Sequence, residues 1–399
     1  MRVSTNNSFA SGVSSLQGRQ NELQEAQQRL TSGKRIQRAS DDPTGAAQAE
    51  RALANINRID ATQRSLESSR NAMQVSEGAM GDAVELMQQI RETLVSAGNG
   101  SYKDTDRAVL ANRLVGLRES LLAVANRPDG TGGYLFGGQG AASPPFLDTA
   151  GGVAYKGTAG AIRGSQDENM PLSVDGAAAW LQAPTGNGIF ETRNTNSTTA
   201  WIGPGTVTDP SQLALTTGTV YSVQFSGSGA TSTYAVLKDG APTAAAGPFK
   251  PGQSIEVDGM AFTIQGAPAD GDSFEIVPST EGLSIFNTLD SAISDLQSPG
   301  RSTGQVSQTV TNGIRDLDAS LARMLSVRSE LGEAMNGLDG TESRFASQKL
   351  YSQTEQSNAE DLDMVQGISD FQNQQTGYDA ALKAYSMVQR LTLFQYLNG

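Results

Sequence analysis

The segment LTSGKRIQRASDDPTGAA, from Leu30 to Ala47, lies between two amphipathic helical patterns. A seven-residue repeat precedes it and keeps one narrow apolar stripe on one helix face, as a helix needs when its partner is another helix. The residues of this repeat are Phe9, Leu16, Leu23 and Leu30. A second helical pattern begins after Asp41-Asp42-Pro43. We therefore expect the segment to be a joint between two helices.

The start of the second helix carries its own capping signals. Ser40 or Asp41 is expected to accept hydrogen bonds from the exposed first amides of that helix. Pro43 suits the first helical position, where its missing N–H is no loss. Asp41 and Asp42 could instead form a metal-binding or acid pair. A cap is favoured, because anionic groups at a helix start interact well with the helix dipole.

The composition restricts the chemistry that the chain can perform. Its 399 residues include no His and no Cys, which removes imidazole bases, thiol nucleophiles, cysteine–histidine zinc sites and disulfides. Carboxylate, Lys or Ser chemistry remains open. The net charge of −13 argues against general nucleic-acid binding, which needs a basic face. No cofactor is predicted.

The beginning of the chain has a different charge balance. Residues 1–38 hold six basic side chains, which suit either a solvated helix face or contact with an acidic partner: Arg2, Arg19, Arg29, Lys34, Arg35 and Arg38. The first residues, MRVSTNNSFASG, lack the apolar core of a secretory signal peptide. No span approaches 18 apolar residues, so we expect no membrane insertion and no export by the general route.

Helical patterns dominate both ends of the chain, and the middle is β-rich. Apolar periodicity predicts helices over about 44–97 and 104–127, and helical patterns return after Ser279. Eleven of the 14 Pro lie between Thr131 and Thr280, where alternating segments such as YSVQFSG and DSFEIVP predict strands. Asp258-Gly259 is a strong hairpin signal. The fold class is therefore α+β and multidomain: terminal coiled-coil helices, an elongated helical bundle built from both chain ends and a β-rich central insert.

Several motifs resemble the bacterial flagellin superfamily and, within it, the hook-associated protein 3 group of hook–filament junction proteins. They are LTSGKRIQRASDDP at 30–43, AGNGSYKDTDR at 97–107, NRPDGTGGYLFGG at 126–138, SNAEDLD at 357–363 and LTLFQYL at 391–397. The resemblance covers roughly residues 1–146 and 282–399. Pro43 after the Asp pair, the glycine-framed YLFGG and the ending LFQYL resemble the junction group rather than filament flagellin.

The resemblance implies three domains. Residues 1–42 with 357–399 would form an inner domain of terminal helices, and 43–146 with 282–356 a helical rod. Residues 147–281 would be the outer β-rich insert. The terminal helices would be disordered before incorporation and helical after it, and their apolar faces would be the assembly surface: Phe9, Leu16, Leu23, Leu30, Tyr385, Val388, Leu391, Phe394 and Leu397. The joint between inner domain and rod would comprise Lys34, Arg35, Ile36, Arg38, Asp41, Asp42 and Pro43.

The resemblance also implies a function without catalysis. The chain would be a structural junction protein of the extracellular bacterial flagellum, exported by the flagellar type III route without a cleaved signal. It would join hook-associated protein 1 to flagellin, contact copies of itself in a ring, and be masked before export by a cytoplasmic chaperone. A flagellin-type filament subunit is the alternative. An enzyme and a cytoplasmic coiled-coil scaffold are competing classes, but no convergent catalytic set is apparent.

Three further motifs could bind ions or phosphate, but each also has a purely structural interpretation. Glu360-Asp361 with Asp363 is expected to be a solvated face or to contact the basic joint segment rather than to bind a cation. Asp270-Gly271-Asp272 with Glu275 lacks the full spacing of a calcium loop and predicts a turn. The glycines at 130–140 do not follow the phosphate-binding pattern and predict a hinge into the insert.

Overall fold

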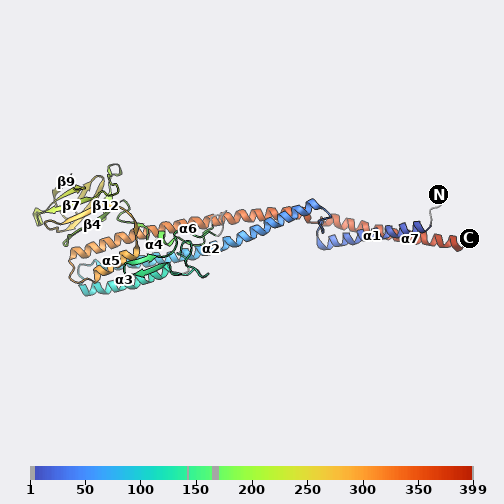
Figure 1. Cartoon of the computed structure of the whole chain (residues 1–399), viewed down its shortest axis with the longest axis horizontal. Helices are drawn as coiled ribbons and strands as arrows, with labels where there is room; N and C mark the ends of the chain where they lie inside the picture. Colours follow the sequence, from blue (N-terminus) through green and yellow to red (C-terminus); the bar gives the residue numbers. More distant parts are fainter. Residues whose placement is uncertain (1–4, 142, 164–169, 398–399) are drawn as a thin grey trace. The chain divides into compact units, whose positions relative to one another are not determined.

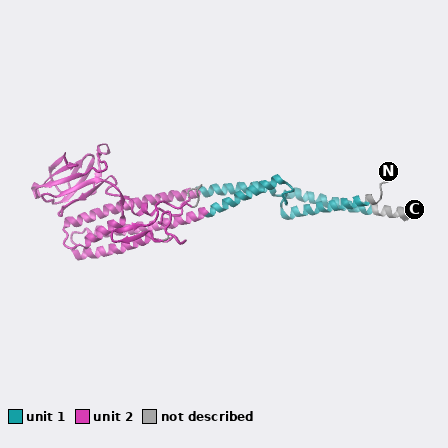
Figure 2. Ribbon diagram, viewed as in Figure 1, with its two compact units in different colours: residues 1–64, 340–399 teal, residues 65–339 magenta. Residues whose placement is uncertain are grey.

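The computed structural model describes residues 5–141, 143–163 and 170–397, with the side chains of its two terminal helices described from Phe9 to Met387. The chain divides into two compact units, residues 1–64 with 340–399 and residues 65–339 (Figure 2). Each unit combines an early and a late part of the chain. Two long helices contribute residues to both units: α2 (Pro43–Ala97) and α6 (Thr303–Glu360).

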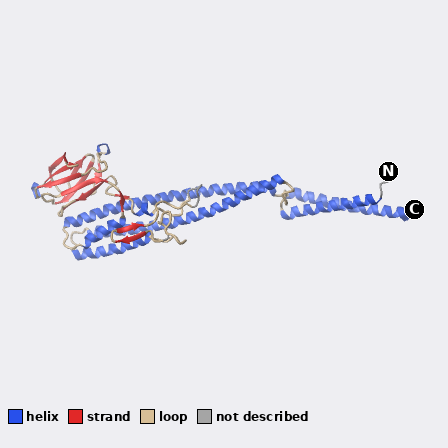
Figure 3. Cartoon of the chain, in the orientation of Figure 1, coloured by secondary structure: helices blue, strands red, loops and turns tan. Residues whose placement is uncertain are grey.

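Over residues 5–64 and 340–397, the first unit is helical apart from the joint (Figure 3). The first helix, α1 (Thr5–Ser32), lies beside the last helix, α7 (Met364–Leu397) (Figure 1). Beyond the joint, the beginning of α2 runs beside the end of α6. Buried Ala52, Ile56 and Ile59 follow helical steps along α2. Asp60, a polar residue on the same apolar stripe, forms an ion pair of 2.6 Å with Lys349 of α6.

The second unit contains a four-helix core. The later part of α2 and the earlier part of α6 share this core with α3 (Asp104–Ala125) and α5 (Ile285–Gln297). Ion pairs connect α2 to α6 along their length, among them Arg91–Asp318 at 2.9 Å. The helix bounds agree with those expected from the apolar repeats to within two residues for α2 and α3. Periodic burial therefore explains why these sequences form helices.

Side chains from residues 135–141, 143–163 and 170–181 join this helical core. Phe136 and Trp180 lie edge to face at 5.5 Å, and Trp180 stacks on Phe286 of α5 at 6.0 Å. Within the predicted glycine hinge at 130–140, the Phe136 side chain is fully buried. Gly138 has a φ of +66°, and a Cβ there would collide with the Thr158 carbonyl oxygen, so only glycine fits. The elements of this region are β1 (Phe146–Thr149), β2 (Gly152–Tyr155), α4 (Gly176–Trp180) and β3 (Ala183–Pro184), which pairs with β13 (Glu281–Leu283).

A separate β-rich core follows, and two sheets share it. The larger sheet is antiparallel in the order β4-β12-β7-β8-β9, with bounds Phe190–Asn194, Ser273–Pro278, Tyr221–Ser226, Thr233–Lys238 and Ala241–Pro248. The smaller has the order β10-β11-β5, and β6 also pairs with β11; the bounds are Ser254–Val257, Met260–Gly266, Ala200–Ile202 and Thr206–Val207. Asp258 and Gly259 both have positive φ between β10 and β11, as the hairpin prediction requires.

Polar side chains of α6 fix the β-rich core to the helices. The Gln308 side-chain amide accepts from the Ile202 N–H at 2.9 Å and donates to the Ile202 carbonyl at 3.3 Å. Gln308 therefore bonds to β5 as a neighbouring strand would. Two turns further along α6, the buried Arg315 guanidinium donates to the Thr192 carbonyl of β4 at 2.8 Å. Burial raises the pKa of the neighbouring Asp316 carboxyl.

A buried arginine links three elements of the second unit. Arg118 of α3 donates to both carboxylate oxygens of Asp148 at 2.7 and 2.9 Å, and to Asp290 of α5 at 2.9 Å. Its side chain is only 9% exposed, whereas the two carboxylates are about half exposed. The hydrogen bond from Arg118 lowers the pKa of Asp148. The cluster fixes the β1 hairpin to α3 and α5.

We predict that Arg118→Ala lowers the free energy of unfolding by about 2–3 kcal/mol, because it removes charge-assisted hydrogen bonds in a buried position. Urea unfolding followed by circular dichroism measures this loss, and Arg113→Ala on the exposed side of α3 is the matched control. Because the folded pKa of Asp148 is lowered, the stabilisation is present above the unfolded pKa of about 3.9 and is lost as pH falls through the folded value. A loss equal to that of Arg113→Ala would contradict the prediction.

Candidate assembly surface and joint

The apolar seam between α1 and α7 is shallow. The predicted seam residues Leu16, Leu23, Leu30 and Tyr385 are only half-buried, and Phe9 is 51% exposed although its ring lies 5.7 Å from that of Tyr385. The side chains of four other predicted seam residues lie outside the described part of the structure: Val388, Leu391, Phe394 and Leu397. Two helices joined by so little burial are marginal in isolation.

Large apolar side chains are exposed elsewhere in the first unit. Val365 and Ile368 of α7 are 81% and 48% exposed, and Leu350 and Tyr351 of α6 about two-thirds exposed. Met364, Leu382 and Met387 are exposed as well. Of these residues, only Leu382 belongs to the apolar face that the sequence predicts for the last helix. Exposed large apolar side chains of this kind are candidates for contact with other molecules.

At the joint, backbone hydrogen bonds hold the segment that follows α1 against the segment between α6 and α7. The Leu362 N–H donates to the Gly33 carbonyl at 2.9 Å, and the Arg35 N–H donates to the Glu360 carbonyl at 2.7 Å. Lys34 and Asp361 thereby form an antiparallel bridge. Sequence reasoning missed this pairing. The sequence feature that could have indicated it is that helical patterns stop at Gly33 and again near Asp361.

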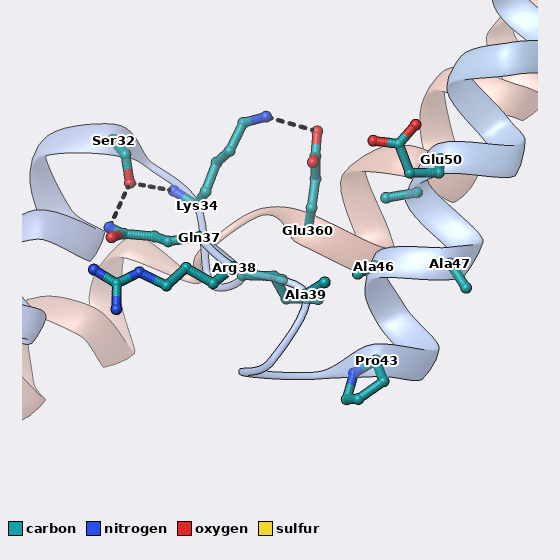
Figure 4. Close-up of a pocket in the computed structure, with 12 residues that line it drawn as sticks. Ser32, Lys34, Gln37, Arg38, Ala39, Pro43, Ala46, Ala47, Glu50 and Glu360 are labelled. Carbon is teal, nitrogen blue, oxygen red and sulfur yellow. Dashed lines mark hydrogen bonds and ion pairs between the residues drawn. The ribbon is translucent and has the colours of Figure 1, made fainter.

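Side chains strengthen the same connection. The Lys34 ammonium lies 3.1 Å from the Glu360 carboxylate (Figure 4). The Arg35 guanidinium donates to the Ala359 carbonyl at 2.7 Å and to Asp42 at 3.3 Å. The predicted contact between the basic segment and the acidic one is therefore confirmed for Lys34 and Glu360. Both are partly exposed, so this ion pair is worth less than a buried one.

The two adjacent aspartates have separate tasks. Asp41 closes the turn before the helix, accepting from the Gln37 and Arg38 N–H groups at 3.2 and 3.0 Å. Asp42 caps α2, accepting from the Gly45 N–H at 3.0 Å and from the Thr44 hydroxyl at 2.8 Å. The backbone N–H of Arg38 lowers the pKa of Asp41, and that of Gly45 lowers the pKa of Asp42.

The expectation that Ser40 or Asp41 caps α2 is thus wrong. The cap is Asp42, because the turn that Asp41 closes ends one residue later than the sequence suggested. Pro43 begins α2, as expected.

Ile36 is the apolar anchor of the joint and is only 8% exposed. Its Cδ1 lies over Gly45, where an added Cβ would come within 2.6 Å of it. An open groove of about 660 Å³ lies beside it, with small side chains such as Ala46 and Ala49 in its lining. Figure 4 shows Arg38 extending past Gln37, while Lys34 reaches toward Glu360. The structure thus brings all seven predicted joint residues into one short connection.

Within the described residues, no group of three or more carboxylate side chains is placed to hold a metal ion. The Asp270–Asp272 segment is a turn, in which Asp272 accepts from the Ser197 hydroxyl at 2.6 Å and the Ala269 N–H at 2.9 Å. None of the helices in the described ranges combines the length and apolarity needed to cross a membrane.

Comparisons with known proteins agree with this architecture. Residues 3–141 match the bacterial flagellin N-terminal helical region. Residues 189–278, which form the separate β-rich core, match the D2-like domain of flagellar hook-associated protein 1. The chain is 26% identical over 408 residues to flagellar hook-associated protein 3 of Escherichia coli (strain K12), with 99% of each chain covered.

Two further relatives differ in how much of the chain they match. The crystal structure of flagellar hook associated protein-3 from Legionella pneumophila superposes with a TM-score of 0.69 at 27% identity, covering 76% of this chain and 97% of that one. Polar flagellin F of Vibrio parahaemolyticus is 29% identical over 134 residues, which is 34% of this chain and 36% of the flagellin.

Paired terminal helices, a helical core built from both chain ends and these matches make the chain similar to proteins of the bacterial flagellin superfamily. Over its full length the chain is homologous to flagellar hook-associated protein 3.

We predict that Asp42→Ala increases hydrogen–deuterium exchange in the first turns of α2, because it removes the acceptor for the Gly45 N–H. Asp42→Asn keeps a good capping oxygen and should exchange like the wild type. Asp41→Ala should loosen residues 37–41 and leave the first turn of α2 protected. Since the pKa of Asp42 is lowered in the fold, acidification below that value should reproduce the effect of Asp42→Ala. Unchanged exchange in Asp42→Ala would show that this carboxylate is not the cap.

Proposed function

We propose that the chain is a structural junction protein of the bacterial flagellum, which joins the hook, through hook-associated protein 1, to the flagellin filament. One observation carries this proposal: the apolar faces of α1 and α7 are incompletely buried within one chain. Burial of apolar surface contributes about 25 cal/mol per Å². Copies of the chain that cover these faces for one another would gain the free energy that holds a ring together.

The domain roles follow from this proposal. The terminal helices would form the inner assembly domain, and the joint at 33–42 would connect it to the helical rod. The β-rich core, similar to a domain of hook-associated protein 1, would lie outside the axial assembly. The residue ranges of these domains remain a prediction. The first third of the predicted insert, residues 147–281, contributes Val153 and Trp180 to the helical core.

The remaining features of the proposal concern partners and export. The chain would leave the cell through the flagellar type III channel without a cleaved signal, and an export chaperone would mask the C-terminal helix beforehand. It would catalyse no reaction. Hook-associated protein 1 and flagellin are the neighbours we propose on its two sides.

A flagellin-type filament subunit is the second candidate. Flagellins match about a third of the chain, whereas hook-associated protein 3 of two organisms matches 99% of it. The full-length similarity favours the junction role.

Removal of the gene, followed by electron microscopy of the cells, tests the function. We expect hooks without filaments and flagellin shed into the medium, both restored by the wild-type gene. Normal filaments would contradict the junction role. Filaments that are still attached to hooks but are shorter than normal would indicate a filament subunit instead.

We predict that Val365→Glu blocks incorporation without unfolding the chain. Val365 is 81% exposed in the single chain, so the substitution costs the fold little, but a carboxylate buried between copies would be costly. Incorporation is measured by immunogold labelling of flagella in the deletion strain. Gln372→Glu, at an exposed position of the same helix, adds the same charge as a control. Equal incorporation of the two variants would place Val365 outside the assembly surface.

A further inference from the structure

Asparagine followed directly by glycine occurs five times in the chain, with the asparagines at positions 99, 187, 312, 336 and 398. Such a pair can react without an enzyme, because the glycine nitrogen can attack the asparagine side-chain carbonyl and glycine has no Cβ to hinder it. The pair at 398 lies outside the described residues. The other four belong to one compact unit and differ in their surroundings.

Asn99 lies in the turn between α2 and α3, and both it and Gly100 are exposed. Its side-chain oxygen accepts from the Ser101 N–H at 3.0 Å. This bond polarises the carbonyl and holds it beside the peptide that carries the attacking nitrogen. Within the described ranges, neither the Gly100 N–H nor the Asn99 amide nitrogen donates a hydrogen bond to the protein. Both reacting nitrogens are therefore free to move.

The pair at Asn187 is held on both reacting sides. The Asn187 side-chain oxygen accepts from two backbone N–H groups at 3.0 and 2.9 Å, and its amide nitrogen donates to the Gly205 carbonyl at 3.2 Å. The Gly188 N–H, which would be the nucleophile, donates to the Thr185 carbonyl at 3.2 Å. The turn must open before the nitrogen can attack.

The two remaining pairs lie inside α6, where the helix itself protects them. A helical N–H is bonded to the carbonyl four residues earlier, and a helical ψ of about −42° does not bring the side-chain carbonyl onto the next nitrogen. The Asn312 side-chain oxygen also accepts from Gln308 at 2.8 Å. Asn336 and Gly337 are exposed, so this pair separates the effect of helical structure from that of exposure.

We propose that Asn99 is the site at which the folded chain deamidates, through a succinimide formed with Gly100. The Gly100 nitrogen bonds to the Asn99 Cγ, the Cγ–Nδ2 bond breaks, and ammonia leaves with the proton that the Gly100 nitrogen loses. Solvent water then opens the ring. Attack at Cγ gives an ordinary aspartate at position 99, and attack at the main-chain carbonyl gives isoaspartate.

Both products alter the connection between α2 and α3. Each places a negative charge at the carboxyl end of α2, where the helix dipole is already negative. Isoaspartate also adds a carbon to the main chain, in a turn where the Tyr102 N–H donates to the Asn99 carbonyl at 3.1 Å. We therefore expect the modified turn to open more readily. This inference is independent of the proposed function.

Ageing of the purified full-length chain in mildly alkaline buffer tests the proposal. Peptide mapping by mass spectrometry measures deamidation at each pair, and chromatography separates isoaspartate from aspartate. Asn99 should react about tenfold faster than Asn187, Asn312 or Asn336, because each tenfold corresponds to about 1.4 kcal/mol of local opening at a protected site. The rate should rise with pH, since the attacking nitrogen must lose its proton.

Unfolding the chain in urea provides the first control. All four asparagines are followed by glycine, so their rates should become similar once the fold is lost. Gly100→Ala should slow the reaction at Asn99 alone, because it adds a Cβ at the attacking residue; that Cβ meets nothing within 4 Å, so the fold tolerates it. Ser101→Ala, which keeps both the glycine and the backbone N–H at 101, should leave the rate unchanged.

Two outcomes in the folded chain would overturn the proposal: equal rates at Asn99 and Asn336, or a faster reaction at Asn187. A further measurement tests the effect on the turn. Asn99→Asp reproduces one product, and hydrogen exchange over residues 98–103 should be faster in it than in Asn99→Gln, which stays neutral. Equal exchange in these two variants would show that the added charge does not loosen the turn.

Discussion

The pairing of the two ends of the chain is the constraint on which the rest of the structure depends. The first helix, α1, pairs with the last, α7, and the beginning of α2 pairs with the end of α6, so both pairs need the two ends of the chain. More than 200 residues separate the partners along the sequence. The entropic cost of closing such loops grows only slowly with length, so a large β-rich insert is compatible with this arrangement. Because long-range contacts form late, we expect the ends to be the last parts to order.

Stability is distributed unevenly as a result. The four-helix core buries large side chains completely, and the β-rich core does the same with a second set. In contrast, the α1–α7 seam is half-buried, and local opening is easiest where few apolar contacts must be broken. The backbone bridge at Lys34 and Asp361 joins both crossings of the chain at the boundary between α1–α7 and the neighbouring helices. It keeps the two crossings together even when the seam beyond it opens.

Much of this architecture could be predicted from the sequence, because long periodic segments carry a strong signal. The helices at 43–97 and 104–125 and the hairpin at Asp258-Gly259 follow from local patterns alone. The packing of Phe136, Trp180 and Phe286 could not be predicted, since it depends on three segments far apart in the chain. The capping residue was misassigned because Ser40, Asp41 and Asp42 are all good caps. Only the geometry of the turn at 37–41 decides between them. Short strands such as β1 and β2 lacked a pattern long enough to read.

The Gln308 side chain has a consequence for how the molecule behaves among many copies of itself. It occupies both backbone bonding groups of Ile202 on β5, which is the outer strand of the smaller sheet. An open strand edge is a template on which another chain can add a strand, and such edges promote aggregation. A glutamine side chain from a helix thus occupies hydrogen-bonding groups that another strand would otherwise use. It therefore leaves the backbone of Ile202 closed to an added strand from another molecule.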